Sequence, residues 1–539
     1  VGLNGFEFGA EGPISKSSKS SYLLNYRYST LGFMSALGIN FGTGTAIPYY
    51  QDITTRFNFP TEKAGTFSVF AIGGVSQIDL ISSNEEDTVD NLYNNDLDIY
   101  DRSKTGIAGI SHQYLIDNSS YTKFTLAASY VMNSDLIDSI SPETLDPVPY
   151  YSQNFTQTKI AGNFFYKKKF NTKHNLQIGV RFDEFLVDII DSIYRSTIDR
   201  YITLTEYDGN TFLLQPYAQY QYRVSDKMSL NAGLHYQYLG LNGSSSLEPR
   251  AGIKYQINEK NALSFGYGLH SMMAPIATYF KTVEAGVGNY ITPNDSIDFV
   301  KAHHIVLGYD LQLSPTIRMK TEVYYQHLYD VLIDKDSSSY SVLNTGSLTF
   351  GSPDYLKNSG TGRNYGAELT LEKFMDKGMY FLVTGSLYRS EYTGSDKIER
   401  ESAFSGNYVT NFVGGKEFTL FPNRVGQKTK KSIVLDTKFT LAGGQRYTPI
   451  DLEESILAGE TKYDWDNAYG DQFDDYMRLD LRTAFKMDGK FATQEWAIDI
   501  QNITSRQNPL YQRFNPIEGQ IDTVYQLGFF LVPQYRITF

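Results

Sequence analysis

The sequence of 539 residues has no cysteine, only two tryptophans and no long run of apolar residues. The lack of cysteine excludes a disulfide framework, a thiolate zinc site and a cysteine nucleophile. A membrane-spanning helix needs about 18 or more consecutive apolar residues, and no segment approaches that length. A helical membrane protein is therefore excluded. A membrane β-barrel is not excluded, because each of its strands gives only a weak hydropathy signal.

Basic charge is also scarce, with 48 lysines and arginines against 60 aspartates and glutamates, and a formal net charge of −12. This balance argues against nucleic acid as a partner, because phosphate binding needs a basic face. The seven histidines are scattered. His303 and His304 are neighbours on an expected strand, so they point to opposite faces and cannot chelate one metal together. No catalytic constellation emerges, and the protein is not predicted to be an enzyme.

Tyrosine and phenylalanine are abundant instead, with 43 and 34 copies, and the chain shows a clear period of two. In residues 212–224, apolar side chains alternate with polar ones such as Gln215 and Arg223. Segments 228–238 and 249–257 repeat this alternation. Successive side chains of a strand point to opposite faces, so each segment is predicted to be a strand with one apolar and one polar face. The fold is predicted to be all-β.

The strand lengths favour a transmembrane antiparallel β-barrel over a soluble sandwich, which would also alternate. Strands of globular proteins run for about 5–6 residues, whereas a tilted strand that crosses a bilayer needs about 9–11. Many of the alternating segments here reach or exceed the longer figure. Their polar faces carry Gln, Arg, Glu and Lys, as expected of a wet lumen, and Tyr and Phe lie near segment ends, as in interfacial girdles. Membrane lipid is therefore an expected partner.

Short and long connections alternate along the chain. Short turns are expected near residues 61–63, 117–119, 171–173, 225–227, 259–260, 314–316, 376–378 and 488–490. Long polar loops are expected at residues 29–48, 76–103, 132–153, 189–209, 272–299, 331–362 and 443–473. In bacterial outer-membrane barrels the short turns are periplasmic and the long loops extracellular. The pattern predicts this orientation and a location in the bacterial outer membrane.

Twenty-one strands can be placed directly. They are expected near residues 6–12, 20–28, 50–58, 65–75, 104–116, 120–131, 154–168, 174–188, 210–224, 228–241, 247–257, 262–271, 300–313, 317–330, 363–374, 378–393, 406–417, 429–442, 474–487, 492–504 and 531–539. An odd number would put the termini on opposite sides of the membrane. Asn4-Gly5 is a strong hairpin signal, so Val1-Gly2-Leu3 is interpreted as the stub of one more strand. Residues 1–539 are therefore predicted to form one barrel of about 22 strands, truncated within its first strand.

Several passages resemble known outer-membrane proteins. The last segment carries Tyr535, Ile537 and Phe539 on one face and ends on Phe539, which is similar to the C-terminal assembly signal of outer-membrane barrels. Six further passages, in this order and spacing, resemble TonB-dependent receptors, particularly the Bacteroidota type: Gly12–Pro13, Leu247–Gly252, Gly268–Ser271, Arg363–Leu369, Gly443–Pro449 and Asp499–Thr504. The resemblance covers the whole chain. It implies a receptor that captures a scarce nutrient at the cell surface and imports it with energy relayed by TonB.

The resemblance also implies a plug domain and a TonB-contacting segment N-terminal to the barrel, and this chain contains neither. Barrels of about 22 strands are usually plugged, because an open one would be a wide water-filled hole. A plug is therefore expected upstream of Val1. The polar side chains expected to hold it by ion pairs are Glu248, Arg250, Lys254, Glu368 and Glu372.

Two loops carry candidate ligand contacts. The loop at residues 271–298 contains Met272, Met273, Tyr279 and Phe280, and this apolar cluster could fold inward to bind a ligand or a partner protein. It could equally pack on its own loop or on the plug. Trp465, in the expected loop at residues 443–473, could stack on a sugar or an aromatic ligand, or could serve only as an interfacial anchor.

Acidic loops offer weak candidates for Ca²⁺, the one cofactor considered. Carboxylates suit this hard cation, and Asp96, Asp98, Asp464 and Asp466 lie in such loops. No spacing matches a known calcium loop, and a solvated acidic surface explains the residues equally well.

Three functions remain open from the sequence. An active-transport receptor is the main prediction. A passive channel and a structural subunit of a larger outer-membrane assembly are the alternatives. A surface lipoprotein that caps the loops is compatible with the receptor. The cargo cannot be predicted, because one architecture serves many ligands.

Overall fold

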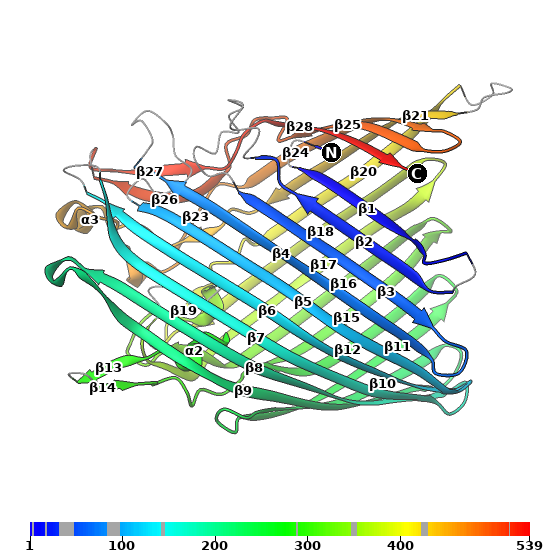
Figure 1. Cartoon of the computed structure of the whole chain (residues 1–539), viewed down its shortest axis with the longest axis horizontal. Coiled ribbons are helices and arrows are strands. Elements are labelled where there is room, and N and C mark those ends of the chain that lie inside the picture. Colours follow the sequence, from blue (N-terminus) through cyan, green and yellow to red (C-terminus); the bar gives the residue numbers. More distant parts are fainter. Residues whose placement is uncertain are drawn as a thin grey trace.

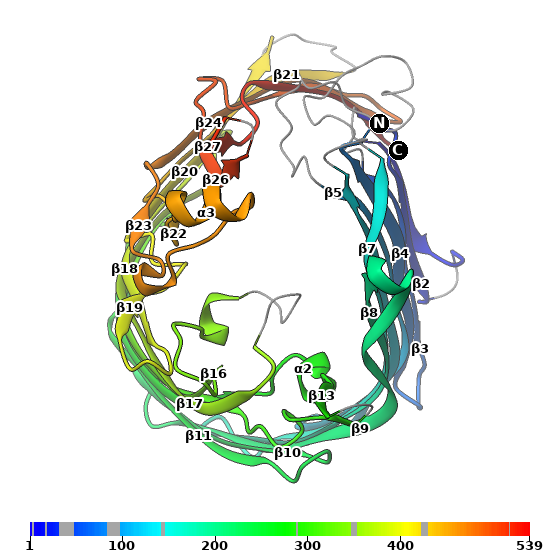
Figure 2. The ribbon, with the colours of Figure 1, turned by 90° about the vertical axis from the view of Figure 1, so that its left-hand side faces the viewer.

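The computed structural model describes residues 1–2, 5–16, 19–31, 48–83, 97–141, 146–286, 289–345, 353–421, 429–516 and 518–539. Twenty-two strands join one antiparallel sheet, which closes on itself as a tilted barrel (Figures 1 and 2). Short turns gather at one end of the barrel and long loops at the other (Figure 1). The prediction of an all-β barrel of about 22 strands is confirmed. Among the described residues, no helix has the length and apolar character that a membrane crossing requires.

The barrel wall is made of long strands in sequence order. They are β1 (Phe6–Pro13), β2 (Ser21–Tyr28), β3 (Tyr49–Pro60), β4 (Thr66–Ile81), β5 (Leu97–Asp117), β6 (Ser120–Ile140), β7 (Pro147–Lys169), β8 (His174–Arg195), β9 (Arg200–Arg223), β10 (Met228–Leu239), β11 (Ser245–Asn258), β12 (Asn261–Met272), β15 (Val300–Ser314), β16 (Ile317–Asp334), β17 (Leu356–Asp376), β18 (Met379–Thr393), β20 (Tyr408–Leu420), β21 (Lys430–Ala442), β24 (Tyr476–Asp488), β25 (Thr493–Gln501) and β28 (Phe530–Thr538). Each matches one expected strand, so the assignment of these 21 segments is confirmed.

The long loops carry short elements of their own. They are β13 (Val283–Gly286), β14 (Asn289–Ile291), β19 (Glu399–Glu401), β22 (Arg446–Tyr447), β23 (Asp471–Gln472), β26 (Pro509–Asn515), β27 (Gln520–Tyr525), the α-helices α2 (Ile276–Phe280) and α3 (Leu452–Ala458), and the 3₁₀ turns η1 (Ser196–Ile198), η2 (Val342–Asn344) and η3 (Trp465–Asn467). Only β19 joins the main sheet, through a hairpin with β18, and it supplies the 22nd strand of that sheet.

The N-terminal residues close the barrel beside the last strand. The amino group of Val1 donates to the carbonyl oxygen of Tyr535 at 2.9 Å, and the Tyr535 amide donates back to Val1 at 2.8 Å. Gly2 bridges both Gln534 and Gly5. Val1 and Gly2 therefore pair with β28 where the stub strand was expected, through an isolated bridge and not a strand of their own, and the two termini lie side by side (Figures 1 and 2). Asn4, in the expected turn, lies outside the described residues.

The expected loop boundaries are wrong on one side of the barrel. Strands β5–β9 are 21 to 24 residues long, so most of the expected loops at 132–153 and 189–209 is strand. The loops at 76–103 and 331–362 are also shorter than expected, because β4 ends at Ile81 and β17 begins at Leu356. Crossing a bilayer takes only about 9–11 residues. Beyond the bilayer, water reaches both faces of the sheet. Strand pairing, such as that of Asp188 with Asp208, therefore continues there without alternation of apolar and polar residues.

Candidate functional site

A cavity of about 940 Å³ is lined by residues of β4–β11. Its lining includes Arg181, Gln215, Tyr217, His235 and Arg250. Arg181 points away from the membrane, because its strand neighbours Val180 and Phe182 are exposed on the outer, apolar face. The cavity therefore offers two guanidinium groups, an imidazole and amide groups to whatever occupies the lumen.

A buried carboxylate organises one side of this cavity. Glu248 has no exposed surface, and its oxygens lie 3.0 Å from His235 Nδ1, accept 2.6 Å from Gln237 Nε2 and accept 2.7 Å from Arg250 Nη2. Glu248 also accepts from the backbone amide and the hydroxyl of Ser271, at 3.1 Å and 2.5 Å. A buried charge is tolerated only with such partners. Glu248 thereby fixes both Arg250 in the lumen and Ser271 at the base of the loop that follows β12.

The expected plug contacts differ in their accessibility. The barrel itself saturates Glu248, which has no surface left to touch a plug directly. Arg250 and Lys254 keep about half of their side chains exposed, although Lys254 lies 3.9 Å from Asp310. Glu368 is exposed, and Glu372 accepts from Arg318 at 3.1 Å. The four accessible side chains stay predicted plug contacts.

The loop between β12 and β15, residues 273–299, folds into the barrel mouth, where Figure 2 shows α2 inside the ring. Tyr279 and Phe280 are buried. The Phe280 ring stacks on Tyr207 of β9 with centroids 3.7 Å apart, and the Tyr279 hydroxyl accepts from the Ala274 amide at 3.2 Å. We call the apolar cluster around them the loop core. It comprises Phe185, Val187, Ile189, Leu213, Leu239, Ala274, Ile276, Tyr279, Phe280, Ile297, Phe299, Leu332 and Leu356.

Of the five expected ligand contacts, Met272 and Trp465 are exposed and Met273 lies at the edge of the loop core. Met272 ends β12 and is 68% exposed, whereas Met273 packs partly buried against the loop core. Trp465 lies on η3 and is 56% exposed, with its ring 5.7 Å from that of Tyr463. Tyr279 and Phe280 are placed in the packing role that the sequence left open. Ligand contact stays a prediction for all five residues.

Of the calcium candidates in the described residues, Asp98 and Asp464 already serve local hydrogen bonds. Asp98 is buried and accepts from the amides of Ser82 and Ser83 at 2.8 Å and 3.0 Å, and from the Ser83 hydroxyl at 2.6 Å. Asp464 caps η3, and Asp96 lies outside the described residues. In the part of the chain that the structure describes, no three acidic or histidine side chains are arranged to hold a metal ion. Calcium binding stays an untested prediction.

One pair of facing carboxylates was not predicted from the sequence. Asp101 of β5 lies directly opposite Asp135 of β6, in the strand extensions beyond the membrane. Burial, together with a hydrogen bond and repulsion from Asp101, raises the pKa of Asp135 to about 6. The sequence pattern assigned residue 135 to a loop, so nothing in it indicated that these two side chains would meet.

The C-terminal strand sits in an aromatic surface. The ring of Tyr535 lies 5.4 Å from that of Trp496, and its hydroxyl donates to Gln494 at 3.1 Å. Ile537 and Phe539 are exposed. A role of these residues in barrel assembly stays a prediction.

Comparisons with known proteins agree with this architecture. The family model described as "TonB dependent receptor-like, beta-barrel" matches residues 4–503. A search of curated proteins finds no match. The structure is similar to the pyoverdine outer-membrane receptor FpvA from Pseudomonas aeruginosa PAO1, with a TM-score of 0.71 and 12% identity over 99% of this chain and 76% of that one.

Two further solved structures show the same fold. The ferric-catecholate import receptor Fiu from E. coli K12 has a TM-score of 0.70 and 10% identity over 98% of this chain and 78% of its own. The copper transporter OprC has a TM-score of 0.65 and 10% identity over 99% of this chain and 78% of its own. At such low identities the structural similarity supports the fold alone, and the family match supports the function. The chain therefore belongs to the TonB-dependent receptor-like β-barrels, which are transport receptors of the bacterial outer membrane.

Proposed function

We propose that this barrel is the outer wall of a Bacteroidota-type importer whose lumen holds a plug domain supplied by a segment N-terminal to Val1. The lumen wall carries the proposal: Arg181 and Arg250 line a wide cavity, and Arg250 is held in place by the buried carboxylate of Glu248. Arg250 and Lys254 on one side, and Glu368 and Glu372 on another, supply charges of both signs for a plug. Residues 1–539 form one barrel domain in this proposal.

Cargo is captured at the extracellular mouth. Trp465 offers an exposed aromatic face in the loop between β21 and β24, and Met272 offers an exposed thioether beside the loop core. Aromatic and thioether groups adapt to ligands with apolar or ring surfaces. The role is binding and transport, not catalysis.

One side of the receptor is built to meet a partner. Strands β5–β9 extend well past the length that a bilayer needs, and their outer face keeps Leu186 and Ile190 exposed. A surface lipoprotein or a neighbouring subunit of a larger assembly would cover these side chains.

The test is the intact mass and N-terminal sequence of the receptor from native outer membranes, combined with nutrient-limited growth of strains with and without TonB. The proposal expects a plug-sized extension before Val1 and growth that requires both receptor and TonB. A native chain that starts at Val1 would overturn the plug. Growth that is unaffected by loss of TonB would instead favour a passive channel, and growth without the receptor would favour a structural subunit.

A further inference from the structure

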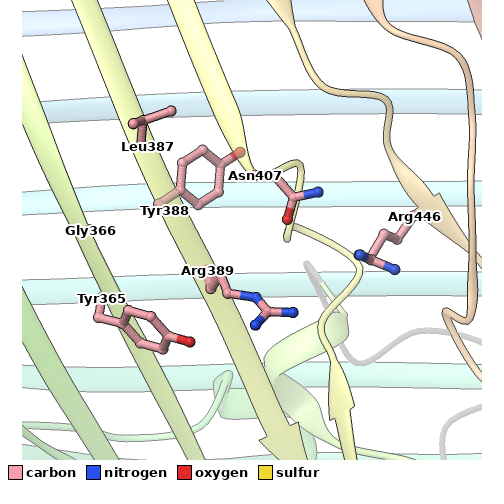
Figure 3. A pocket seen from close by; sticks show the side chains of 7 residues that line it. All are labelled: Tyr365, Gly366, Leu387, Tyr388, Arg389, Asn407 and Arg446. Carbon is pink, nitrogen blue, oxygen red and sulfur yellow. The ribbon is translucent and has the colours of Figure 1, made fainter.

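A cavity of about 540 Å³ opens where two barrel strands separate. Its lining is Tyr365, Gly366, Leu387, Tyr388, Arg389, Asn407 and Arg446 (Figure 3). Strand β18 pairs with β20 only as far as Leu387 opposite Tyr408. Beyond that point β18 turns to β19, with Glu391 opposite Glu401. The cavity therefore lies in a fork of the wall, at the extracellular end.

Hydrogen-bond donors dominate the polar lining of this cavity. Arg389 donates to Glu401 at 2.5 Å, and Arg446 donates through Nε to the carbonyl oxygen of Ser405 at 3.1 Å. Arg446 takes part in none of the ion pairs formed within the described segments. Glu401 neutralises the Arg389 guanidinium, whereas the Arg446 guanidinium has no ion-pair partner among the described residues. Tyr365 and Tyr388 also line the cavity.

The cavity adjoins the outer, lipid-facing surface. Register places Leu387 opposite Ala367 and Arg389 opposite Tyr365, and Ala367 lies opposite the exposed Val323. Leu387 is 68% exposed and is eight positions past Met379, the first residue of β18. A strand crosses the bilayer in about 9–11 residues. Leu387 therefore lies where the apolar belt ends, and Arg389 lies just above it.

We propose that this fork is a phosphate-binding site that takes the head group of an anionic lipid from the outer leaflet. Arg446 and Arg389 hold the phosphate, because guanidinium groups match its geometry with paired hydrogen bonds. Leu387 and Val323 contact the acyl chain below. Arg446 lies in the same loop as Trp465, between β21 and β24, but lipid binding at the fork does not depend on the proposed transport function.

The test uses the purified receptor in an uncharged detergent. Native mass spectrometry and a titration with phosphatidylglycerol, with phosphatidylcholine and with inorganic phosphate measure binding to wild type, Arg446→Gln and Arg363→Gln. Arg363 is a matched control, because it lies on β17, beside the cavity, but is already bound to Glu391 and Glu399. We expect phosphatidylglycerol to bind wild type and Arg363→Gln equally, and Arg446→Gln about tenfold more weakly, as the loss of one charge-assisted hydrogen bond implies.

The other outcomes are decisive as well. Phosphatidylglycerol binding that equals phosphatidylcholine binding, or that is unchanged in Arg446→Gln, would overturn the site. Inorganic phosphate that binds as tightly as the lipid would show a free-anion site and refute the lipid as occupant. If Arg446→Gln does not fold, Leu387→Gln serves instead, because it removes only the chain contact and should weaken the lipid while leaving inorganic phosphate unaffected.

Discussion

At the scale of single residues, Glu248 is the side chain on which the lumen wall and the extracellular loop both depend. Glu248→Ala removes the acceptor shared by His235, Gln237, Arg250 and Ser271. Leaving a buried donor such as the Gln237 amide without an acceptor costs about 1–3 kcal/mol, and the half-exposed Arg250 can be solvated instead. We expect a clear drop in Tm and faster proteolysis of residues 273–299, measured by thermal unfolding and mass spectrometry of the fragments.

An exposed ion pair supplies the control for that change. Glu372→Ala removes the partner of Arg318 on a wet lumenal surface, where such pairs contribute about 0–1 kcal/mol. Its Tm should stay near that of wild type. Equal losses in the two variants would show that burial of Glu248 is not what makes it important.

The carboxylate pair outside the membrane predicts a pH effect. The pKa of Asp135 is about 6 in the folded protein and about 3.9 in an unfolded chain. Between these values the folded state holds more protons, so stability falls as the pH rises from about 4 to about 6. Asp135→Asn removes the charge. Its Tm should exceed that of wild type at pH 7.5 and equal it near pH 4, and a constant difference at both pH values would contradict the pairing with Asp101.

At the scale of elements, the loop core predicts that α2 is held by packing. Phe280→Ala deletes the ring that stacks on Tyr207, and a large buried aromatic side chain replaced by alanine typically costs about 3–5 kcal/mol. We expect rapid cleavage within residues 273–299 by added protease, while the barrel stays resistant. Met272→Ala, at an exposed position, should cleave like wild type. Protection in Phe280→Ala would mean that other contacts hold the loop.

The strands were predictable from the sequence, and the mouth was not. Residues such as Ile178, Val180 and Phe182 alternate with polar ones because one face meets lipid and the other meets water. Above the membrane that contrast between the two faces vanishes, so Asp191 and Asp208 looked like loop residues although they are paired in β8 and β9. The partners of Glu248 come from three strands, β10, β11 and β12, and their meeting depends on register, which single-strand alternation does not reveal.

At the scale of the whole molecule, the barrel is a closed ring whose first and last segments meet at Val1 and Tyr535, and the proposed plug would fill its lumen. In the proposed plug-bearing receptor, reversing the charge of Arg250 and Lys254 together should loosen the plug, because both would then repel the acidic plug groups that the proposal pairs with them. We expect the double variant Arg250→Glu, Lys254→Glu to show raised single-channel conductance in planar bilayers. Wild type should stay closed.

The control for this last experiment is a charge reversal away from the lumen wall. Lys490, in the turn between β24 and β25, lies over the ring of Phe491, and Lys490→Glu should leave the receptor closed. Open channels in both variants would indicate general damage to the barrel. If the lumenal double variant stayed closed, the plug would be held by other residues, and Glu368 and Glu372 of β17 would become the contacts to reverse next, since they carry the opposite charge.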